Sequence, residues 1–160
     1  MVEVIEADLD QPAQAQAVID LLDCYAQEPE GGGVAIGEQV KRDLIPALQR
    51  RRDALILLAM QEGNAVGLLN AFEAFSTFAA APLLNIHDVY VVPPLRGKGV
   101  GRAMFEYAER VARNRGYCKM TLEVLSGNLP AQRLYLAQGF EAYALDERMG
   151  HALFWQKKLS

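Results

Sequence analysis

The sequence has few cysteines and histidines and no long apolar run, and each shortage excludes a class of protein. Its 160 residues include two cysteines, Cys24 and Cys118, and two histidines far apart. Two isolated thiols cannot build a disulfide framework, and neither pair has metal-ligand spacing, so we expect a reducing compartment and no metal. The longest apolar-rich runs, Ala54–Met60 and Phe78–Leu84, are too short to cross a bilayer, which needs about 20 residues. The acidic N-terminus lacks the basic start of a signal peptide, so we expect a cytoplasmic protein without membrane contact.

An excess of positive charge is also missing. The formal net charge is −4, whereas a general nucleic-acid binder usually carries a basic stripe. The balance therefore argues against a nucleic-acid partner and favours small cationic substrates. Hydrophobic residues make up 51% of the chain and charged residues 22%, which is typical of a globular protein. The length fits one domain spanning residues 1–160.

The hydrophobic pattern predicts a mixed α/β fold in which strands dominate the middle of the chain. Asp8 or Asp10 is expected to cap the first helix, and Glu62-Gly63-Asn64 reads as a hairpin turn. We predict helices over Pro12–Cys24, near Glu38–Arg51, from Val100 to a C-cap at Gly116, and from Asn128 to before Gly139. We predict strands over Val2–Glu6, Ala54–Gln61, Ala65–Phe75, Asn85–Val92 and Lys119–Leu125, and a closing hairpin formed by Phe140–Leu145 and Ala152–Lys157.

One segment, Val89–Arg102, carries a recognisable chemical signal. It reads as a strand, a double-proline stop at Pro93-Pro94, and a basic glycine-rich turn that opens a helix. Glycines let the backbone approach a ligand closely, and the first N–H groups and the dipole of the helix favour an anion. Arg96, Lys98 and Arg102 add full positive charges. The turn is therefore predicted to bind a phosphate or pyrophosphate.

The spacing within the turn excludes two common phosphate-binding motifs. A P-loop needs a serine or threonine directly after its lysine, and Gly99 follows Lys98 here. A dinucleotide fingerprint needs Gly-x-Gly-x-x-Gly, but the glycines fall at 97, 99 and 101. Taken alone, the segment is also consistent with a structural turn that has a charged surface.

Two motifs in register resemble the GNAT superfamily of acyltransferases. Arg96-x-x-Gly99-x-Gly101 after Val89-Tyr90-Val91 is similar to the coenzyme A loop of that family. Leu122-x-Val124, followed by Asn128-x-x-Ala131-x-x-Leu134-Tyr135-x-x-x-Gly139-Phe140, is similar to its strand–helix–strand signature. The resemblance covers roughly residues 85–140. It implies a mostly antiparallel twisted sheet of about six to seven strands flanked by about four helices.

The resemblance also implies where acetyl-CoA binds. Backbone N–H groups of the turn would hold the pyrophosphate, and one backbone edge would pair with the pantetheine arm like an added strand. Asn128 would cap its helix and also reach the cofactor, although a simple N-cap is an equal alternative. The implied binding residues are Val89, Val91, Arg96, Gly97, Lys98, Gly99, Val100, Gly101, Arg102 and Asn128.

The family's general acid falls on Tyr135. A phenol, with an ordinary pKa of about 10, can protonate a thiolate whose ordinary pKa is about 8.5. A tyrosine on an amphipathic helix can instead be a core residue with a satisfied hydroxyl. Glu123 is a further candidate for catalysis and equally a solvated strand residue. His151 lies beside a turn, and we expect no catalytic role for it.

The general base is less clearly marked. Some relatives place a histidine at the position of His87 and use it to relay the proton of the amine, which suits an imidazole. A packed, hydrogen-bonded His87 is an equal alternative. Other relatives carry a catalytic glutamate where this chain has Asn85. Strand alternation predicts that Asn85, His87, Val89 and Val91 share one face and that Asp88, on the opposite face, is structural.

The predicted activity is transfer of acetyl from acetyl-CoA to a primary amine of a small molecule or a protein. The glycine-rich loop Pro29–Gly33 and the early helices would form the acceptor pocket. A non-catalytic acyl-CoA sensor is the alternative, and a nucleotide-phosphate enzyme is a third hypothesis. A homodimer is a further possibility, since apolar side chains at 72–83 could face either a partner subunit or the core: Phe72, Phe75, Phe78 and Leu83. The acids that could attract a cation, or form an ordinary solvated surface, are Glu28, Glu30, Glu38 and Asp43.

Overall fold

The computed structural model describes residues 1–144 and 146–159, apart from the side chain of residue 147. Its contacts divide the chain into two compact units, Met1–Leu122 and Glu123–Ser160. Each unit is described by itself below.

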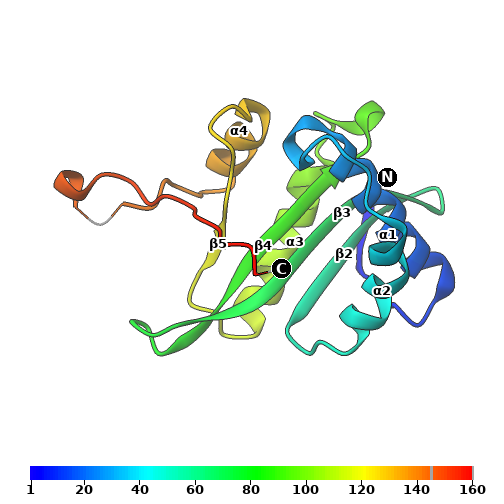
Figure 1. The fold of residues 1–160 in the computed structure, drawn as a ribbon, viewed down its shortest axis with the longest axis horizontal. Coiled ribbons are helices and arrows are strands. Elements are labelled where there is room, and N and C mark those ends of the chain that lie inside the picture. Colours follow the sequence, from blue (N-terminus) through cyan, green and yellow to red (C-terminus); the bar gives the residue numbers. More distant parts are fainter. Residues whose placement is uncertain (145, 160) are drawn as a thin grey trace. The chain divides into compact units, whose positions relative to one another are not determined.

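The first unit is built on a five-stranded sheet (Figure 1). Neighbours along the sheet are also neighbours along the chain, the first four strands are antiparallel, and the last is parallel to the fourth. Both residues of the tight turn at Glu62-Gly63 have positive φ, as the predicted hairpin requires. The mixed α/β prediction is confirmed, with five strands in the described residues rather than six to seven. They are β1 (Glu3–Glu6), β2 (Ala54–Gln61), β3 (Asn64–Ser76), β4 (Ala81–Val91) and β5 (Met120–Leu122).

Three helices cover the two faces of this sheet. α1 (Pro12–Gln27) and α2 (Glu38–Gln49) pack on one face, and α3 (Val100–Asn114) packs on the other, behind the strands in Figure 1. No helix in the described part of the chain has both the length and the apolar character needed to cross a membrane. The core under α1 and α2 consists of Val18, Leu21, Leu48, Ile56, Leu58, Leu68 and Tyr90. The side chains buried toward α3 include Leu57, Ala59, Leu69, Leu84, Ile86, Met104, Phe105 and Ala108.

The helix ends match the sequence prediction at α3 but not at α1. Gly116 follows α3 with a φ of 72°, and Tyr117 N–H donates to the Ala112 carbonyl, which is the expected left-handed C-cap. At α1 the N-cap is Gln11, with no side-chain hydrogen bond. Neither predicted residue is the cap: Asp8 Oδ1 accepts from the Asp10 N–H, before the helix begins, and Asp10 Oδ1 accepts from Gln49 Nε2.

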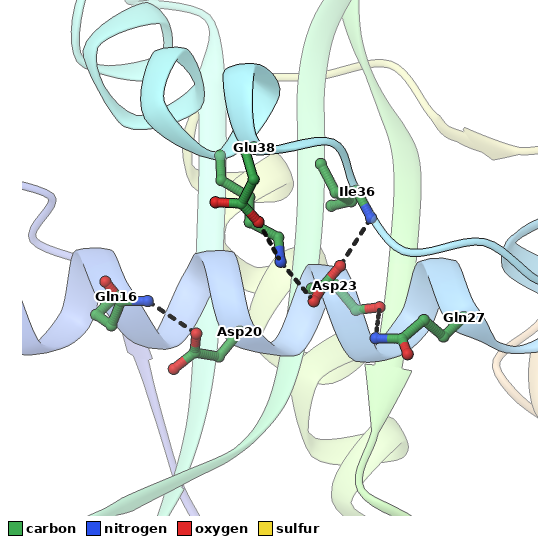
Figure 2. A network of polar contacts seen from close by, with 7 residues as sticks. Gln16, Asp20, Asp23, Gln27, Ile36 and Glu38 are labelled. Atoms are coloured by element: carbon green, nitrogen blue, oxygen red, sulfur yellow. Dashed lines mark hydrogen bonds and ion pairs between the residues drawn. The ribbon is translucent and has the colours of Figure 1, made fainter.

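The connection between α1 and α2 is fastened by Asp23 (Figure 2). Its Oδ1 accepts from the Ile36 N–H at 2.7 Å, and its Oδ2 accepts from Lys41 Nζ at 2.8 Å. The hydrogen bond from Lys41 is the main cause that lowers the pKa of Asp23, followed by that from Ile36. Both ends of the α1–α2 loop are thereby fixed to helices, while its glycines lie exposed between them.

Replacing Asp23 by asparagine is expected to lower the thermal midpoint near neutral pH. The pKa of Asp23 lies below its ordinary value of 3.8 in the folded protein, so the charged form stabilises the fold above that pH. This contribution is lost as the pH falls through the lowered folded value. The midpoints of wild type and Asp23→Asn should therefore converge on acidification. Asp20→Asn, an exposed carboxylate on the same helix, is the control, and a constant difference at all pH values would contradict the assignment.

The second unit contains one longer helix, α4 (Leu129–Ala137). Asn128 Oδ1 accepts from the Ala131 N–H at 3.2 Å, so the predicted N-cap is confirmed. Gly139, with a φ of 83°, follows the end of the helix as predicted.

The closing hairpin is not formed in the described residues. Neither 140–144 nor 152–157 is a strand, and residue 145 lies outside the described residues. A strand exists only with a ladder partner, and the described backbone bonds give these segments none. Leu153, Phe154 and Trp155 are 75%, 78% and 82% exposed, so their β-like pattern buries no face. The two strands of this hairpin are the two that the sequence predicted in excess of the five observed in the part of the chain that the structure describes.

Candidate active site

The glycine turn before α3 presents unpaired backbone N–H groups. Gly97 and Gly99 have φ values of 72° and 86°, and Gly99 is the N-cap of the helix without a side-chain hydrogen bond. The Arg96 and Lys98 N–H groups donate to carbonyls of residues 93 and 95. The first intrahelical bond runs from Ala103 N–H to the Gly99 carbonyl, so the N–H groups of Gly99–Arg102 have no helical acceptor. A Cβ built at Gly97 or Gly99 would meet no atom within 4 Å. The turn therefore has donors, an aligned helix dipole and open space for a phosphate.

The charged side chains of the turn are not equally available. Arg96 is ion-paired with Glu28, at the C-terminal end of α1, and its Nε donates to the Val91 carbonyl at 2.9 Å. Arg102 Nε lies 2.7 Å from Glu106 Oε1, on the next turn of α3. Lys98 is exposed and has no ion-pair partner in the described residues. The turn thus relies on its backbone and on Lys98, while Arg96 ties it to α1.

The outer edge of β4 is open beside the turn. β5 pairs only with Leu84–Ile86, so in the first unit the remainder of β4 has no strand on that side. Val92 N–H donates inward to the Val66 carbonyl of β3, and strand alternation then turns the backbone groups of Val89 and Val91 outward. The Val91 carbonyl already accepts from Arg96. The Val89 groups and the Val91 N–H face the open edge.

A bulge in β4 changes which side chains share a face. Asn70 of β3 pairs with Asp88, whereas the next residue, Ala71, pairs with Ile86, which leaves His87 as the extra residue. Asp88 is therefore on the same face as Asn85, the face that carries α1 and α2. The predicted alternation, with Val89 and Val91 on the face of Asn85 and Asp88 opposite, was wrong because a bulge resets the period of two.

His87 and Asn85 line an open cavity of about 480 Å³ on this face. His87 is exposed, and its ring meets Phe72 edge-on with centroids 5.0 Å apart. Asn85 Nδ2 donates to Thr121 Oγ1 of β5 at 2.9 Å. The other lining residues are Arg51, Phe72, Glu73 and Ala74. The ring of His87 is therefore exposed at the rim of the cavity rather than packed within the core.

Next to this cavity lies a polar pair that sequence reasoning missed. Asn70 is 4% exposed, and its Nδ2 donates to Asp88 Oδ2 at 3.0 Å. Its own carbonyl oxygen, Oδ1, is buried without a hydrogen-bond partner. The signal in the sequence was a single amide in the apolar run Gly67-Leu68-Leu69-Asn70-Ala71.

Negative charge gathers where α1 ends. Burial raises the pKa of the Tyr25 phenol first, and the charges of Asp88, Glu30 and Glu28 raise it further. The centroid of the Tyr25 ring lies 6.3 Å from the centroid of the Tyr90 ring. Of the predicted acceptor-side acids, Glu28 is held by Arg96, Glu38 lies 3.6 Å from Lys41, and Asp43 accepts from Gln39.

The remaining candidates belong to the second unit. Tyr135 is half-buried on α4, and its ring centroid lies 6.1 Å from that of Phe140. Glu123 is exposed directly after β5, outside the strand in which it was predicted. His151 is exposed in irregular backbone.

Comparisons with known proteins agree on one family. A model described as the acetyltransferase (GNAT) family matches residues 16–140. A streptothricin acetyltransferase of Streptomyces lavendulae is 40% identical over 86 residues, which covers 54% of this chain and 46% of that protein. An aminoalkylphosphonate N-acetyltransferase of Salmonella typhimurium is 32% identical over 87 residues, 52% of this chain and 54% of that protein. The chain thus spans about half the length of these curated relatives.

A solved structure shares the fold over nearly the whole chain. An aminoglycoside 6'-N-acetyltransferase from Acinetobacter haemolyticus superposes with a TM-score of 0.74, covering 99% of both chains at 18% identity. At that identity the likeness concerns the fold alone.

Proposed function

This chain belongs to the GNAT acetyltransferase family, and we propose that it transfers an acetyl group from acetyl-CoA to a primary amine of a small molecule. One observation carries the donor side of this proposal. The unpaired N–H groups at Gly99–Arg102 and the open edge of β4 adjoin each other in sequence and structure. A molecule with a pyrophosphate at one end of an extended amide-containing arm is complementary to both.

The proposal assigns the cofactor contacts mainly to backbone. Residues 96–102 would hold the pyrophosphate, with Lys98 as the available cation, while Arg96 holds the turn against Glu28 rather than contacting phosphate. Val89 and Val91 would pair with the pantetheine arm, and an outward N–H on this edge could polarise the thioester carbonyl. Asn128, already a helix cap, would add a polar contact.

The chemistry requires three events. The amine nitrogen attacks the thioester carbon and the N–C bond forms, so the amine must give up a proton. The tetrahedral oxyanion must be stabilised, and the C–S bond then breaks to release CoA thiolate. We assign protonation of the thiolate to Tyr135 and removal of the amine proton, directly or through water, to His87. Residues 1–160 act as one cytoplasmic acetyltransferase domain in this proposal, with no metal.

Replacing His87 by glutamine is expected to lower kcat by about 100-fold, the lower end of the usual range for one acid–base group. The acid limb of the pH–rate profile should flatten, because an imidazole must be neutral to accept a proton. His151→Gln, which changes the other histidine, is the control. An unaltered profile in His87→Gln would remove His87 from the mechanism.

The acceptor class is inferred from the relatives and from charge. The named relatives acetylate streptothricin and aminoalkylphosphonates, which are small amines. Asp88, Glu30 and Glu28 around Tyr25 favour a cation on the acceptor side. The test is thiol release from acetyl-CoA with streptothricin, sisomicin, 2-aminoethylphosphonate and spermidine. Release with at least one amine is expected, whereas tight CoA binding without release would favour an acyl-CoA sensor.

A further inference from the structure

The pair Asn70–Asp88 has features of a binding site. The contacts proposed above for acetyl-CoA do not involve it. Asn70 is the one polar residue among the buried side chains of the described chain. A buried amide oxygen without a donor destabilises the folded state, and Asn70 Oδ1 is in that position. A leucine would fill an apolar strand without this cost. We therefore look for a ligand with a hydrogen-bond donor that can reach Asn70 Oδ1.

Asp88 is an unusual carboxylate for its place in the fold. It is half-buried, and in the part of the chain that the structure describes it has no cationic partner. Its hydrogen bond comes from the neutral amide of Asn70. The bulge at His87 is what brings it to this face, since strict alternation from Asn85 would have turned it toward α3. The strand thus departs from regular geometry at the point where the carboxylate is presented beside the His87 cavity.

The surroundings of Asp88 favour a cation. Tyr25, Glu28 and Glu30 come from the end of α1 and the loop after it, and the C-terminal end of a helix adds partial negative charge. Arg96 is the positive group here, and Glu28 already pairs with it. The Arg96 guanidinium already lies over the Tyr90 ring, 5.4 Å from its centroid. The Tyr25 ring, 6.3 Å from that of Tyr90 between centroids, is the aromatic surface suited to an ammonium group.

We propose that Asp88 binds an ammonium group of the acceptor and that Asn70 positions the Asp88 carboxylate. This inference rests on the proposed function and adds a specificity-determining residue to it. The acceptor ammonium donates to Asp88, and a further N–H of the same group, or a water bound with it, donates to Asn70 Oδ1. Asp88 selects and orients the cationic acceptor. The bound ammonium loses one proton to solvent before it can attack, and His87 takes the second proton as the N–C bond forms. The site therefore takes protonated primary amines in preference to neutral or anionic acceptors.

The test compares Asp88→Asn with wild type, using streptothricin and spermidine as acceptors. The KM for the amine is expected to rise by about 10-fold to 100-fold, the effect of losing a charge-assisted hydrogen bond. The Kd for CoA should not change, which also shows that the variant is folded. Asp88→Glu, which keeps the charge, should recover part of the loss, and Asp20→Asn should behave as wild type.

A second variant separates the positioning role from a structural one. Asn70→Leu removes the unpaired oxygen, so its thermal midpoint should hold or rise while the KM for the amine rises. A wild-type KM for both amines in Asp88→Asn or in Asn70→Leu would overturn the inference while leaving the acetyltransferase intact. A wild-type protein that acetylates none of the amines would overturn the proposed function and this inference together.

Discussion

Replacing Gly99 by glutamate is expected to weaken CoA binding by at least about 100-fold, the equivalent of losing one or two hydrogen bonds to a charged group. Gly99 has a φ of 86° and caps α3, so the new side chain would project where the pyrophosphate is proposed to bind. Its carboxylate would occupy the N–H groups and repel the phosphate charges. Isothermal titration with CoA measures the effect.

Gly116→Glu is the matched control for this experiment. Gly116 lies at the opposite end of α3, also has a positive φ of 72°, and also has open space around its Cβ position. The two variants therefore share the backbone strain and the added charge but differ in distance from the turn. We expect Gly116→Glu to retain CoA affinity. A folded Gly99→Glu protein that binds CoA as wild type does would show that the turn is not the pyrophosphate site.

Replacing Tyr135 by phenylalanine is expected to lower kcat by roughly 100-fold to 10,000-fold, the range for loss of a general acid. The phenol is proposed to protonate the departing CoA thiolate, and phenylalanine keeps the ring that lies near Phe140. The Kd for CoA should stay unchanged because the change removes one oxygen atom. Stopped-flow measurement of thiol release separates this step from product dissociation.

The control is Tyr107→Phe, a half-buried tyrosine on α3 whose ring lies 5.0 Å from the guanidinium carbon of Arg110. It should keep wild-type turnover. A purely structural Tyr135 would show itself as a lower thermal midpoint with kcat nearly intact, and that result would assign the general acid to another residue.

Signals that act over a few residues predicted much of the fold. The hairpin at Glu62-Gly63, the C-cap at Gly116 and the N-cap at Asn128 all depend on conformations encoded by adjacent residues. The spacing of apolar residues placed α3, and the Asn128 cap and Gly139 placed α4, within a few positions of their observed bounds. These features need no partner elsewhere in the chain.

Features that depend on distant partners were not predicted. The apolar run Ala152–Trp155 is typical of a strand, but an apolar run supplies no partner, and no backbone pairs with it in the described residues. The bulge at His87 exists only in the register between β3 and β4. Its consequence, the placement of Asp88 beside Asn70, followed from neither sequence segment alone.

The candidate site also combines a local feature that the sequence predicted with a long-range contact that it did not. The glycine turn is continuous in sequence, so its spacing predicted an anion site, and the structure shows the unpaired N–H groups that the prediction needs. The pairing of Arg96 with Glu28 joins residues 68 positions apart. That contact pairs one of the charges predicted to bind phosphate with a carboxylate, and sequence spacing could not reveal it.

The most direct test of the account is to incubate the protein with acetyl-CoA carrying an isotopically labelled acetyl group and the panel of four amines, and to weigh the amines by mass spectrometry. The account predicts that at least one amine gains the mass of one labelled acetyl group while an equal amount of free CoA thiol appears. A protein that binds acetyl-CoA yet leaves every amine at its original mass would contradict it.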